Sequence, residues 1–236
     1  MTDTARHIKD AYARRDATKG DRYAWYQRDL GDRIRARNAA LIRVLRQIVC
    51  SSISEVTVLD VGCGTGRLVR FLIDLGFDPE KLMGIDLLED RILDARTRTA
   101  AAAEFEVRDL LESQIERQFD LVFAFTLLSS LVDPVVQGRM IDSLWKCVKP
   151  GGWLIVFDFR FNNPRNHDVI RIRPRDIVGR LHPSRVSTQT LCVPPPVART
   201  IGRYVNGLDR CVVHAMPFLR SHVLLAIQRP CVGDGQ

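Results

Sequence analysis

A glycine-rich turn is the part of the chain whose residue types and spacing most directly indicate chemistry. It follows an apolar run and opens a helix-like stretch, and the segment reads Val58-Leu59-Asp60-Val61-Gly62-Cys63-Gly64-Thr65-Gly66-Arg67-Leu68. Glycine lets a backbone turn sharply and lets a ligand approach it closely. A dinucleotide fingerprint needs glycine where Arg67 stands, and a phosphate-binding loop needs a Gly-Lys-Ser/Thr ending. The turn therefore predicts a ligand site of another kind, preceded by the acid Asp60.

Two further acids end later apolar runs. Asp86 closes the second run within Gly84-Ile85-Asp86-Leu87, and Asp109 closes the third within Val107-Arg108-Asp109-Leu110. A fourth run, Phe119–Phe125, and the turn Val148-Lys149-Pro150-Gly151-Gly152-Trp153-Leu154 follow in the same order. Each acid alone could merely cap a turn or a helix. Together they predict one shared site, because ligands of open α/β sheets bind at the carboxyl ends of the strands.

The elements that must position these residues alternate in type along the chain. Apolar runs predict strands at 56–61, 82–86, 105–109, 121–125, 153–159, 187–193 and 222–228. Helix-like stretches are at 5–17, 31–50, 66–76, 89–102, 112–117, 134–148, 173–181 and 196–214. This alternation is typical of a largely parallel sheet covered by helices on both faces. Residues 1–50 are expected to form an N-terminal helical lid or cap, and residues 51–236 the main domain.

Taken together, these motifs resemble those of the class I S-adenosylmethionine-dependent methyltransferases, over most of residues 55–160. The resemblance implies an α/β, Rossmann-like sheet of seven strands whose last strand is antiparallel. It also implies that the glycine turn packs against the methionine part of S-adenosyl-L-methionine, whose product is S-adenosyl-L-homocysteine. Asp60 would face the amino group, Asp86 the ribose hydroxyls and Asp109 the adenine amino group. The cofactor-binding residues expected from the resemblance are Asp60, Gly62, Cys63, Gly64, Gly66, Asp86, Leu87, Asp109, Leu110 and Phe125.

The segment after the fifth strand is the first choice for contact with a methyl acceptor. It reads Asp158-Phe159-Arg160-Phe161-Asn162-Asn163-Pro164-Arg165-Asn166-His167 and is rich in hydrogen-bonding groups. Asp158 or His167 could be a general base, since either can take a proton from an attacking hydroxyl; otherwise Asp158 caps the loop and His167 is merely exposed. The expected substrate-binding residues are Tyr23, Tyr26, Arg160, Asn162, Asn163 and Arg165. The two tyrosines could equally pack on the domain without touching a ligand.

Charge is segregated along the chain, whose formal net charge is +7. Residues 1–50 carry 12 basic and 6 acidic side chains, residues 51–150 carry 11 and 17, and residues 151–236 carry 12 and 5. Two basic ends suit an anionic partner, although they could also be an ordinary solvated surface. A small-molecule acceptor, anionic or glycan-like, is therefore one expectation. Nucleic acid is the less favoured partner, and peripheral contact with a membrane through the helix at 196–214 is a further possibility.

Composition places the chain among cytoplasmic globular proteins. Hydrophobic residues make up 46% and charged residues 27%, which excludes a disordered chain. The N-terminus lacks the apolar centre of a signal peptide, and no apolar run approaches the roughly 18–20 residues of a membrane span. The six cysteines are scattered, as is typical of a reducing compartment. The five histidines are not spaced with them as metal ligands are, so no metal is expected.

The function expected from these motifs is O-methylation of a small molecule, a sugar or a natural product. Pro194-Pro195-Pro196-Val197-Ala198-Arg199, the Asn-Asn-Pro-Arg-Asn segment and Met216–His222 resemble methyltransferases of bacterial glycan and natural-product biosynthesis. One rival is an RNA methyltransferase that uses the basic ends on phosphates. Another is a non-catalytic cofactor-binding scaffold protein, against which the three intact acids argue. The motifs do not predict the oligomeric state.

Overall fold

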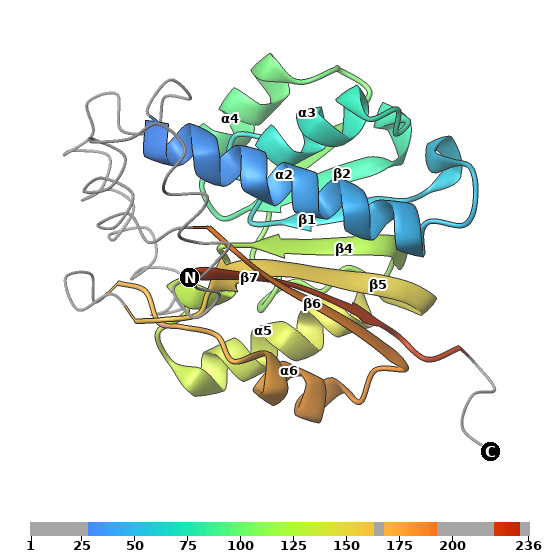
Figure 1. Cartoon of the computed structure of the whole chain (residues 1–236). Helices are drawn as coiled ribbons and strands as arrows, with labels where there is room; N and C mark the ends of the chain where they lie inside the picture. The colour runs from blue at the N-terminus through green and yellow to red at the C-terminus, as the bar shows by residue number, and fades with distance from the viewer. Residues whose placement is uncertain (1–27, 163–167, 193–219, 232–236) are drawn as a thin grey trace.

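A seven-stranded sheet runs through the molecule in the computed structural model, which describes residues 28–162, 168–192 and 220–231 (Figure 1). The strand order is β3-β2-β1-β4-β5-β7-β6. The strands are β1 Val58–Val61, β2 Leu82–Asp86, β3 Glu104–Val107, β4 Phe119–Phe125, β5 Val148–Phe159, β6 Arg185–Leu191 and β7 His222–Gln228. Strand β7 pairs antiparallel with β5 and with β6, while the first five strands pair parallel. The predicted Rossmann-like sheet with an antiparallel last strand is confirmed.

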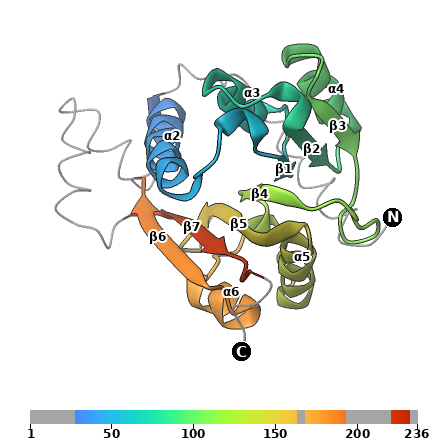
Figure 2. The ribbon, with the colours of Figure 1, turned by 90° about the vertical axis from the view of Figure 1, so that its right-hand side faces the viewer.

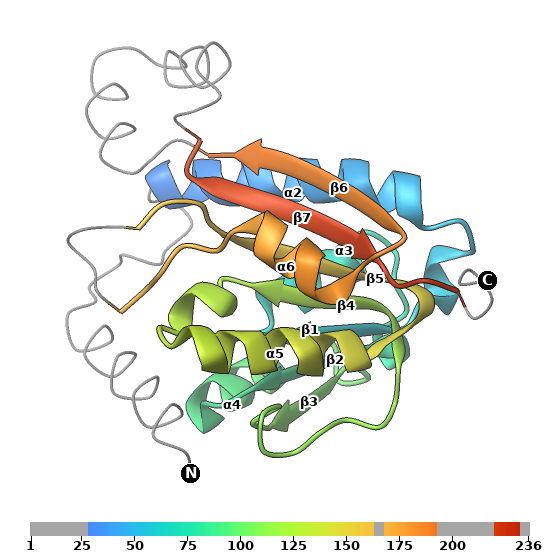
Figure 3. The ribbon, with the colours of Figure 1, turned by 90° about the horizontal axis from the view of Figure 1, so that it is seen from below.

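Helices cover both faces of this sheet. They are α2 Arg28–Ile48, α3 Arg67–Asp74, α4 Glu89–Arg98, α5 Pro134–Lys146 and α6 Pro174–Leu181, with short 3₁₀ turns η1 Ile53–Glu55, η2 Pro79–Lys81 and η3 Leu128–Ser130. Viewed along the sheet, α2, α3 and α4 lie on one side and α5 and α6 on the other (Figure 2). From below, α5 and α6 lie in front of the strands and α2 lies behind them (Figure 3). Each face has its own buried cluster of apolar side chains.

Helix α2 contributes directly to the core of the domain. Its buried residues Ala40, Leu41, Val44 and Leu45 recur at helical spacing and join the cluster on the α3 and α4 face. The predicted helix at 31–50 is therefore present, from residue 28 to residue 48. The expected division of the chain at residue 50 stays a prediction. The predicted helices at 5–17 and 196–214 lie outside the described residues.

The register brings the carboxyl ends of the strands together. Val61 of β1 pairs with Ile85 of β2 and with Ala124 of β4. Further along the sheet, Phe159 at the end of β5 pairs with His222 at the start of β7. Residues that end different strands therefore line a single edge of the sheet, where ligands of such folds bind.

Two sequence predictions of local structure are wrong. Residues 112–117 do not form a helix: the chain turns at 110–112 and is irregular after it. In the turn, the Asp109 carboxylate accepts from Leu111 N–H and the Asp109 carbonyl accepts from Ser113 N–H, both at 2.9 Å. A segment of six residues, five of them polar, is also too short to offset helix nucleation. Strand β5 begins at Val148 rather than 153, since Val148 pairs with Phe119 across an irregular register. None of the helices in the described part of the chain is long and apolar enough to span a membrane.

Candidate active site

The glycine turn between β1 and α3 has a backbone that other residues rarely adopt. Gly62, Gly64 and Gly66 have φ of +74°, +55° and +73°. A Cβ on Gly62 would meet Cδ1 of Leu127 at 3.1 Å, so glycine is needed there for space as well as for conformation. Gly62 and Cys63 both donate N–H to the carbonyl of Ile85, at 2.8 and 3.0 Å. The turn is therefore held against the end of β2.

Asp86 fastens the same turn through its side chain. Its Oδ2 accepts from Gly64 N–H at 2.8 Å, and its Oδ1 accepts from Leu88 N–H at 3.0 Å. Burial raises the pKa of Asp86, and the hydrogen bonds that it accepts from backbone N–H groups oppose the rise. Each carboxylate oxygen has a second lone pair, so the group can still accept hydroxyl hydrogens. The two alternatives left by the sequence, a cap and a ligand contact, are thus compatible at this residue.

Asp60 lies deeper, within β1, with only 2% of its surface exposed. Burial raises the pKa of Asp60 to about 7; the positive charge of Arg37 opposes the rise and the charge of Asp86 adds to it. The carboxyl group accepts no hydrogen bond from any residue in the described part of the chain. A carboxylate in such a position favours a cationic ligand.

Arg37 is a residue of this site that the sequence analysis missed. It lies on α2, and its guanidinium carbon lies 5.3 Å from the centre of the Phe125 ring, which ends β4. Burial, followed by the charge of Arg67, lowers the pKa of Arg37 to about 10. Helical spacing places Arg37 on the face of the buried Leu41, one turn before it, but does not show what that face packs against. What the sequence lacked was the knowledge that α2 crosses this edge of the sheet.

The third acid is brought to the next strand end. Asp109 follows β3, and its Oδ1 accepts from Leu111 N–H at 2.9 Å. The preceding residue, Arg108, donates N–H to the carbonyl of Asp86 at 2.9 Å, which ties the ends of β2 and β3 together. Leu110 is buried and Leu87 is half-buried against the same core. The expected cofactor-binding residues therefore gather along the ends of β1 to β4.

Cys63 has no nucleophilic character in this turn. Its thiol donates weakly to the carbonyl of Gly64 at 3.6 Å, and burial raises its pKa above the ordinary value of a thiol. A protonated, buried thiol packs as a small apolar group. The contribution of Cys63 to the site is therefore its place in the backbone of the turn.

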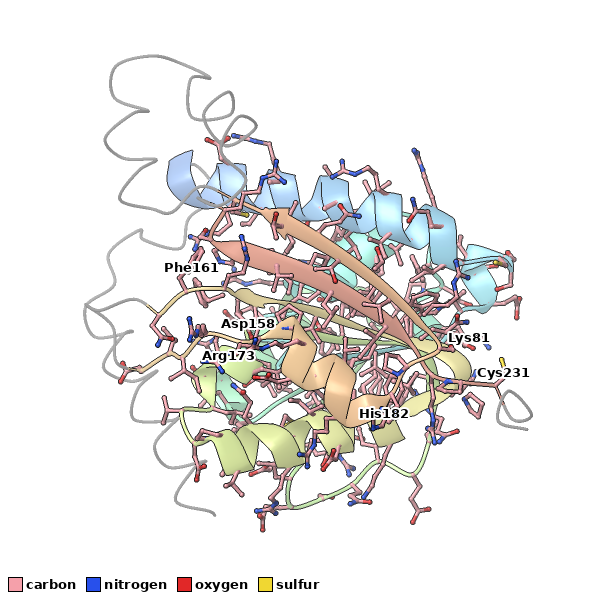
Figure 4. The ribbon with its side chains drawn as sticks, turned by 60° about the horizontal axis from the view of Figure 1, so that its bottom comes forward. Lys81, Asp158, Phe161, Arg173, His182 and Cys231 are labelled. Carbon is pink, nitrogen blue, oxygen red and sulfur yellow. The ribbon has the colours of Figure 1, made fainter. Side chains whose placement is uncertain are left out.

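Asp158, expected as a catalytic base, lies at the end of β5 with 0% exposure. Its Oδ2 accepts from Ser129 N–H and its Oδ1 accepts from Phe159 N–H, both at 2.9 Å. Burial raises the pKa of Asp158 to about 6, and its hydrogen bonds with Ser129 oppose this. Figure 4 shows Asp158 within the fold, whereas Phe161 and Arg173 lie towards the outside. These contacts favour the alternative in which Asp158 anchors the loop, and a catalytic role stays a prediction.

The described part of the expected acceptor loop is braced by its own chain. Arg160 donates Nη1–H to the carbonyl of Arg220 at 2.8 Å, and its guanidinium lies 5.2 Å from the centre of the Phe161 ring. Asn162 accepts from Arg171 N–H at 2.7 Å through its side-chain oxygen. Of the expected residues, Tyr23, Tyr26, Asn163, Arg165 and His167 lie outside the described residues. Contact of Arg160 and Asn162 with an acceptor stays a prediction.

Comparison with known proteins points in the same direction as this geometry. Residues 58–152 match the family model described as a methyltransferase domain. The chain is 29% identical over 184 residues to the ubiquinone biosynthesis O-methyltransferase of Hydrogenovibrio crunogenus, covering 73% of this chain and 72% of that protein.

Two solved structures share the fold at low sequence identity. One is the N-methyltransferase NodS from Bradyrhizobium japonicum in complex with S-adenosyl-L-homocysteine, with a TM-score of 0.66 and 18% identity over 97% of this chain and 100% of that one. The other is the magnesium protoporphyrin IX methyltransferase ChlM from Synechocystis with bound SAM, with a TM-score of 0.62 and 18% identity over 97% and 98%. At this identity the likeness shows the fold alone, and the match to the methyltransferase domain is confined to residues 58–152.

Proposed function

We propose that the chain is a class I S-adenosylmethionine-dependent methyltransferase that methylates an oxygen atom of a small-molecule acceptor. The match of residues 58–152 to a methyltransferase domain and the similarity to an O-methyltransferase support this proposal. The observation that carries this proposal is the convergence of the glycine turn, Asp60 and Asp86 at one edge of the sheet. The curated relative named above, itself an O-methyltransferase, supports oxygen as the acceptor atom.

The residues present fit the cofactor. The glycine turn leaves its backbone open to a ligand: among the described residues, the end of the flexible Arg91 side chain alone lies within 4 Å of a Cβ placed on Gly64. The buried Asp60 carboxyl group is suited to the cofactor's amino group, because a cation there would offset the cost of its burial. Asp86 keeps lone pairs for the ribose hydroxyls, and Asp109 is the acid at the next strand end. We therefore assign these groups to cofactor binding.

The chemistry asks little of the protein beyond binding and alignment. S-adenosylmethionine, when bound, supplies a methyl group already activated by a sulfonium. The chain has to hold the acceptor oxygen in line with that methyl group, and such alignment can supply much of the acceleration. The aromatic side chains at the ends of β4 and β5 exclude water from this region. Each oxygen of the Asp158 carboxyl group already accepts a backbone N–H, and the proposal does not depend on this group as a base.

The proposal also concerns the charge of the acceptor, which we expect to be anionic or glycan-like. Seven arginines between residues 160 and 185 suggested an anionic acceptor from sequence. Arg180 is instead paired with Asp142 on α5, through two contacts of 2.6 Å. Arg171 and Arg173 are exposed beside the acceptor loop. An anionic or glycan-like acceptor thus depends on fewer arginines than the sequence indicated.

A methyl-transfer assay tests the proposed function. The full chain is incubated with radiolabelled S-adenosylmethionine and a panel of phenols, catechols, hydroxy acids and free sugars, and labelled products are identified by mass spectrometry. The result expected is label on an oxygen of one class of small molecule, lost in the Asp86→Ala variant. Label that enters only an added RNA or protein fraction would contradict the proposal. An equal signal from Asp86→Ala would contradict the site assignment.

A further inference from the structure

At the start of β7 lies a buried imidazole, one of whose ring nitrogens makes no hydrogen bond with the described residues. His222 is 1% exposed, and its Nε2 has no hydrogen-bond partner among the described residues. Buried polar atoms are nearly always satisfied, and one left over calls for a specific explanation. Burial, with the charge of Arg33 as a second cause, lowers the pKa of His222 to about 3, so the ring is neutral at any working pH.

The contacts of the other ring nitrogen favour one tautomer, although the second contact is long for a hydrogen bond between two oxygens. Nδ1 lies 2.8 Å from Oγ of Ser221, and the same Oγ lies 3.4 Å from the carbonyl oxygen of Cys192. A serine hydroxyl has one hydrogen to donate. Both contacts are hydrogen bonds only if Nδ1–H donates to Ser221 and Ser221 donates to Cys192. Nε2 then has a lone pair and is a hydrogen-bond acceptor.

The ring is held in place by an aromatic row that leads towards the cofactor residues. His222 stacks on Phe157 with centroids 5.0 Å apart and planes 8° apart, and it also contacts Phe159 at 4.5 Å. Phe157 lies 5.7 Å from Phe125, over which Arg37 lies. Along the sheet, β7 follows β4 and β5 on the side away from β1, β2 and β3. The row therefore extends from the cofactor residues to the acceptor side of the site.

Packing alone does not explain the nitrogen. A phenylalanine would stack on Phe157 equally well and would bury no polar atom. The hydrogen bond with Ser221 explains why a nitrogen is present at the Nδ1 position. It does not explain the nitrogen at the Nε2 position. Nε2 is fixed by the stacking, by the Ser221 contact and by the strand register. A group so positioned is pre-organised for a hydroxyl that arrives with a ligand.

We propose that Nε2 of His222 accepts the hydrogen of the acceptor's hydroxyl group and so orients the oxygen that receives the methyl group. This inference rests on the proposed function and adds the residue that recognises the acceptor. His222 makes one hydrogen bond and orients the oxygen. As the C–O bond to the acceptor forms, the C–S bond of the sulfonium breaks and the hydroxyl proton is released to water. The ring does not keep this proton, because its pKa is too low.

Three variants of the full chain separate a contact with the acceptor from a structural role. Asn at 222 keeps a polar group near Nδ1, Gln keeps one near Nε2, and Phe keeps the stacked ring with neither. Catechol is the probe acceptor, and calorimetry with S-adenosylmethionine measures the cofactor site independently. We expect unchanged cofactor affinity in all three. We expect kcat/KM for catechol to fall about tenfold in His222→Phe and His222→Asn, and about threefold or less in His222→Gln.

Two readouts make the inference refutable. If His222→Phe keeps the kcat/KM of the unaltered protein, the ring acts by packing and the inference is overturned. If His222→Asn keeps it and His222→Gln does not, the Ser221 contact is what matters, and the inference is again overturned. Nitrogen NMR of the unaltered protein must show Nε2 unprotonated and shifted by added catechol. A protonated Nε2 overturns the inference, and so does a protein that binds the cofactor but neither methylates catechol nor shifts this resonance. If the unaltered protein does not bind S-adenosylmethionine, the proposed function itself is overturned.

Discussion

The Asp60→Asn variant should be more stable than the unaltered protein in the absence of cofactor, and it should bind the cofactor poorly. Asp60 is buried in β1, and burial raises its pKa from 3.8 to about 7. A carboxyl group whose folded pKa lies above its unfolded value destabilises the fold when ionised. The stability that the neutral form provides is fully present below the unfolded pKa and is lost as pH rises to 7.

The size of this effect follows from the shift. About three pKa units correspond to an upper limit of about 4 kcal/mol at pH 8. The pKa of about 7 already includes the opposing charge of Arg37, but Asp60→Asn also leaves that buried cation without its partner. With local relaxation as well, we expect a gain of about 1–2 kcal/mol for Asp60→Asn. The gain should shrink as pH falls from 8 to 5, because Asp60 itself becomes neutral in the folded protein.

Urea unfolding without cofactor at pH 5, 6.5 and 8 measures the gain directly. The matched control is Asp90→Asn, which removes the same charge from an exposed position at the start of α4. Calorimetry should show at least a hundredfold weaker binding of S-adenosylmethionine by Asp60→Asn, because the amino group loses its buried counter-ion. A variant that is less stable at pH 8, or a gain that does not change with pH, would refute the reasoning.

Three further substitutions test separate parts of the structure by thermal and urea unfolding. Gly62→Ala should cost about 1–2 kcal/mol, because it strains a left-handed backbone and crowds a neighbour. Its control, Gly179→Ala in α6, should gain up to about 1 kcal/mol, because no described residue outside the helix backbone lies within 4 Å of the added Cβ. Asp158→Asn should cost about 2–3 kcal/mol, because its amide turns one acceptor into a donor facing a backbone N–H. Thr126→Gly should gain about 1 kcal/mol, because a β-branched residue holds φ +53°, whereas Thr97→Gly within α4 should lose about as much.

Each of these has an outcome that would count against it. Gly62→Ala as stable as the unaltered protein would mean that the turn relaxes without strain. Asp158→Asn with unchanged stability and lost methyl transfer would restore the catalytic prediction for that residue. A destabilised Thr126→Gly would show that the threonine side chain contributes more than its backbone conformation costs.

The fold could be read from local pattern because each strand and helix is specified nearby in sequence. The order of apolar runs and glycine turns placed Asp60, Asp86 and Asp109 at strand ends, and the structure has them there. The first and last residues of a strand were harder to predict where pairing with another strand decides them. Val148, for example, belongs to β5 because it pairs with Phe119 of β4.

The parts that sequence could not supply depend on contacts between distant segments. Arg37 joins the site because α2 packs across strand ends about 20 to 90 residues away, and no local signal encodes that crossing. Asp158 looked available for catalysis until the structure showed one of its oxygens bonded by Ser129, in the turn after β4, and the other by Phe159 in β5. The orphan nitrogen of His222 is visible only once β5 and β7 are paired.

Titration of the unaltered protein and of Asp86→Ala with S-adenosylmethionine in a calorimeter tests the cofactor site most directly. Asp86 holds the glycine turn through Gly64 and has lone pairs left for the ribose. We predict one-to-one binding by the unaltered protein and about a hundredfold weaker binding, or none, by the variant. No binding by the unaltered protein, or equal affinity in the two, would contradict the assignment of this edge of the sheet as the active site.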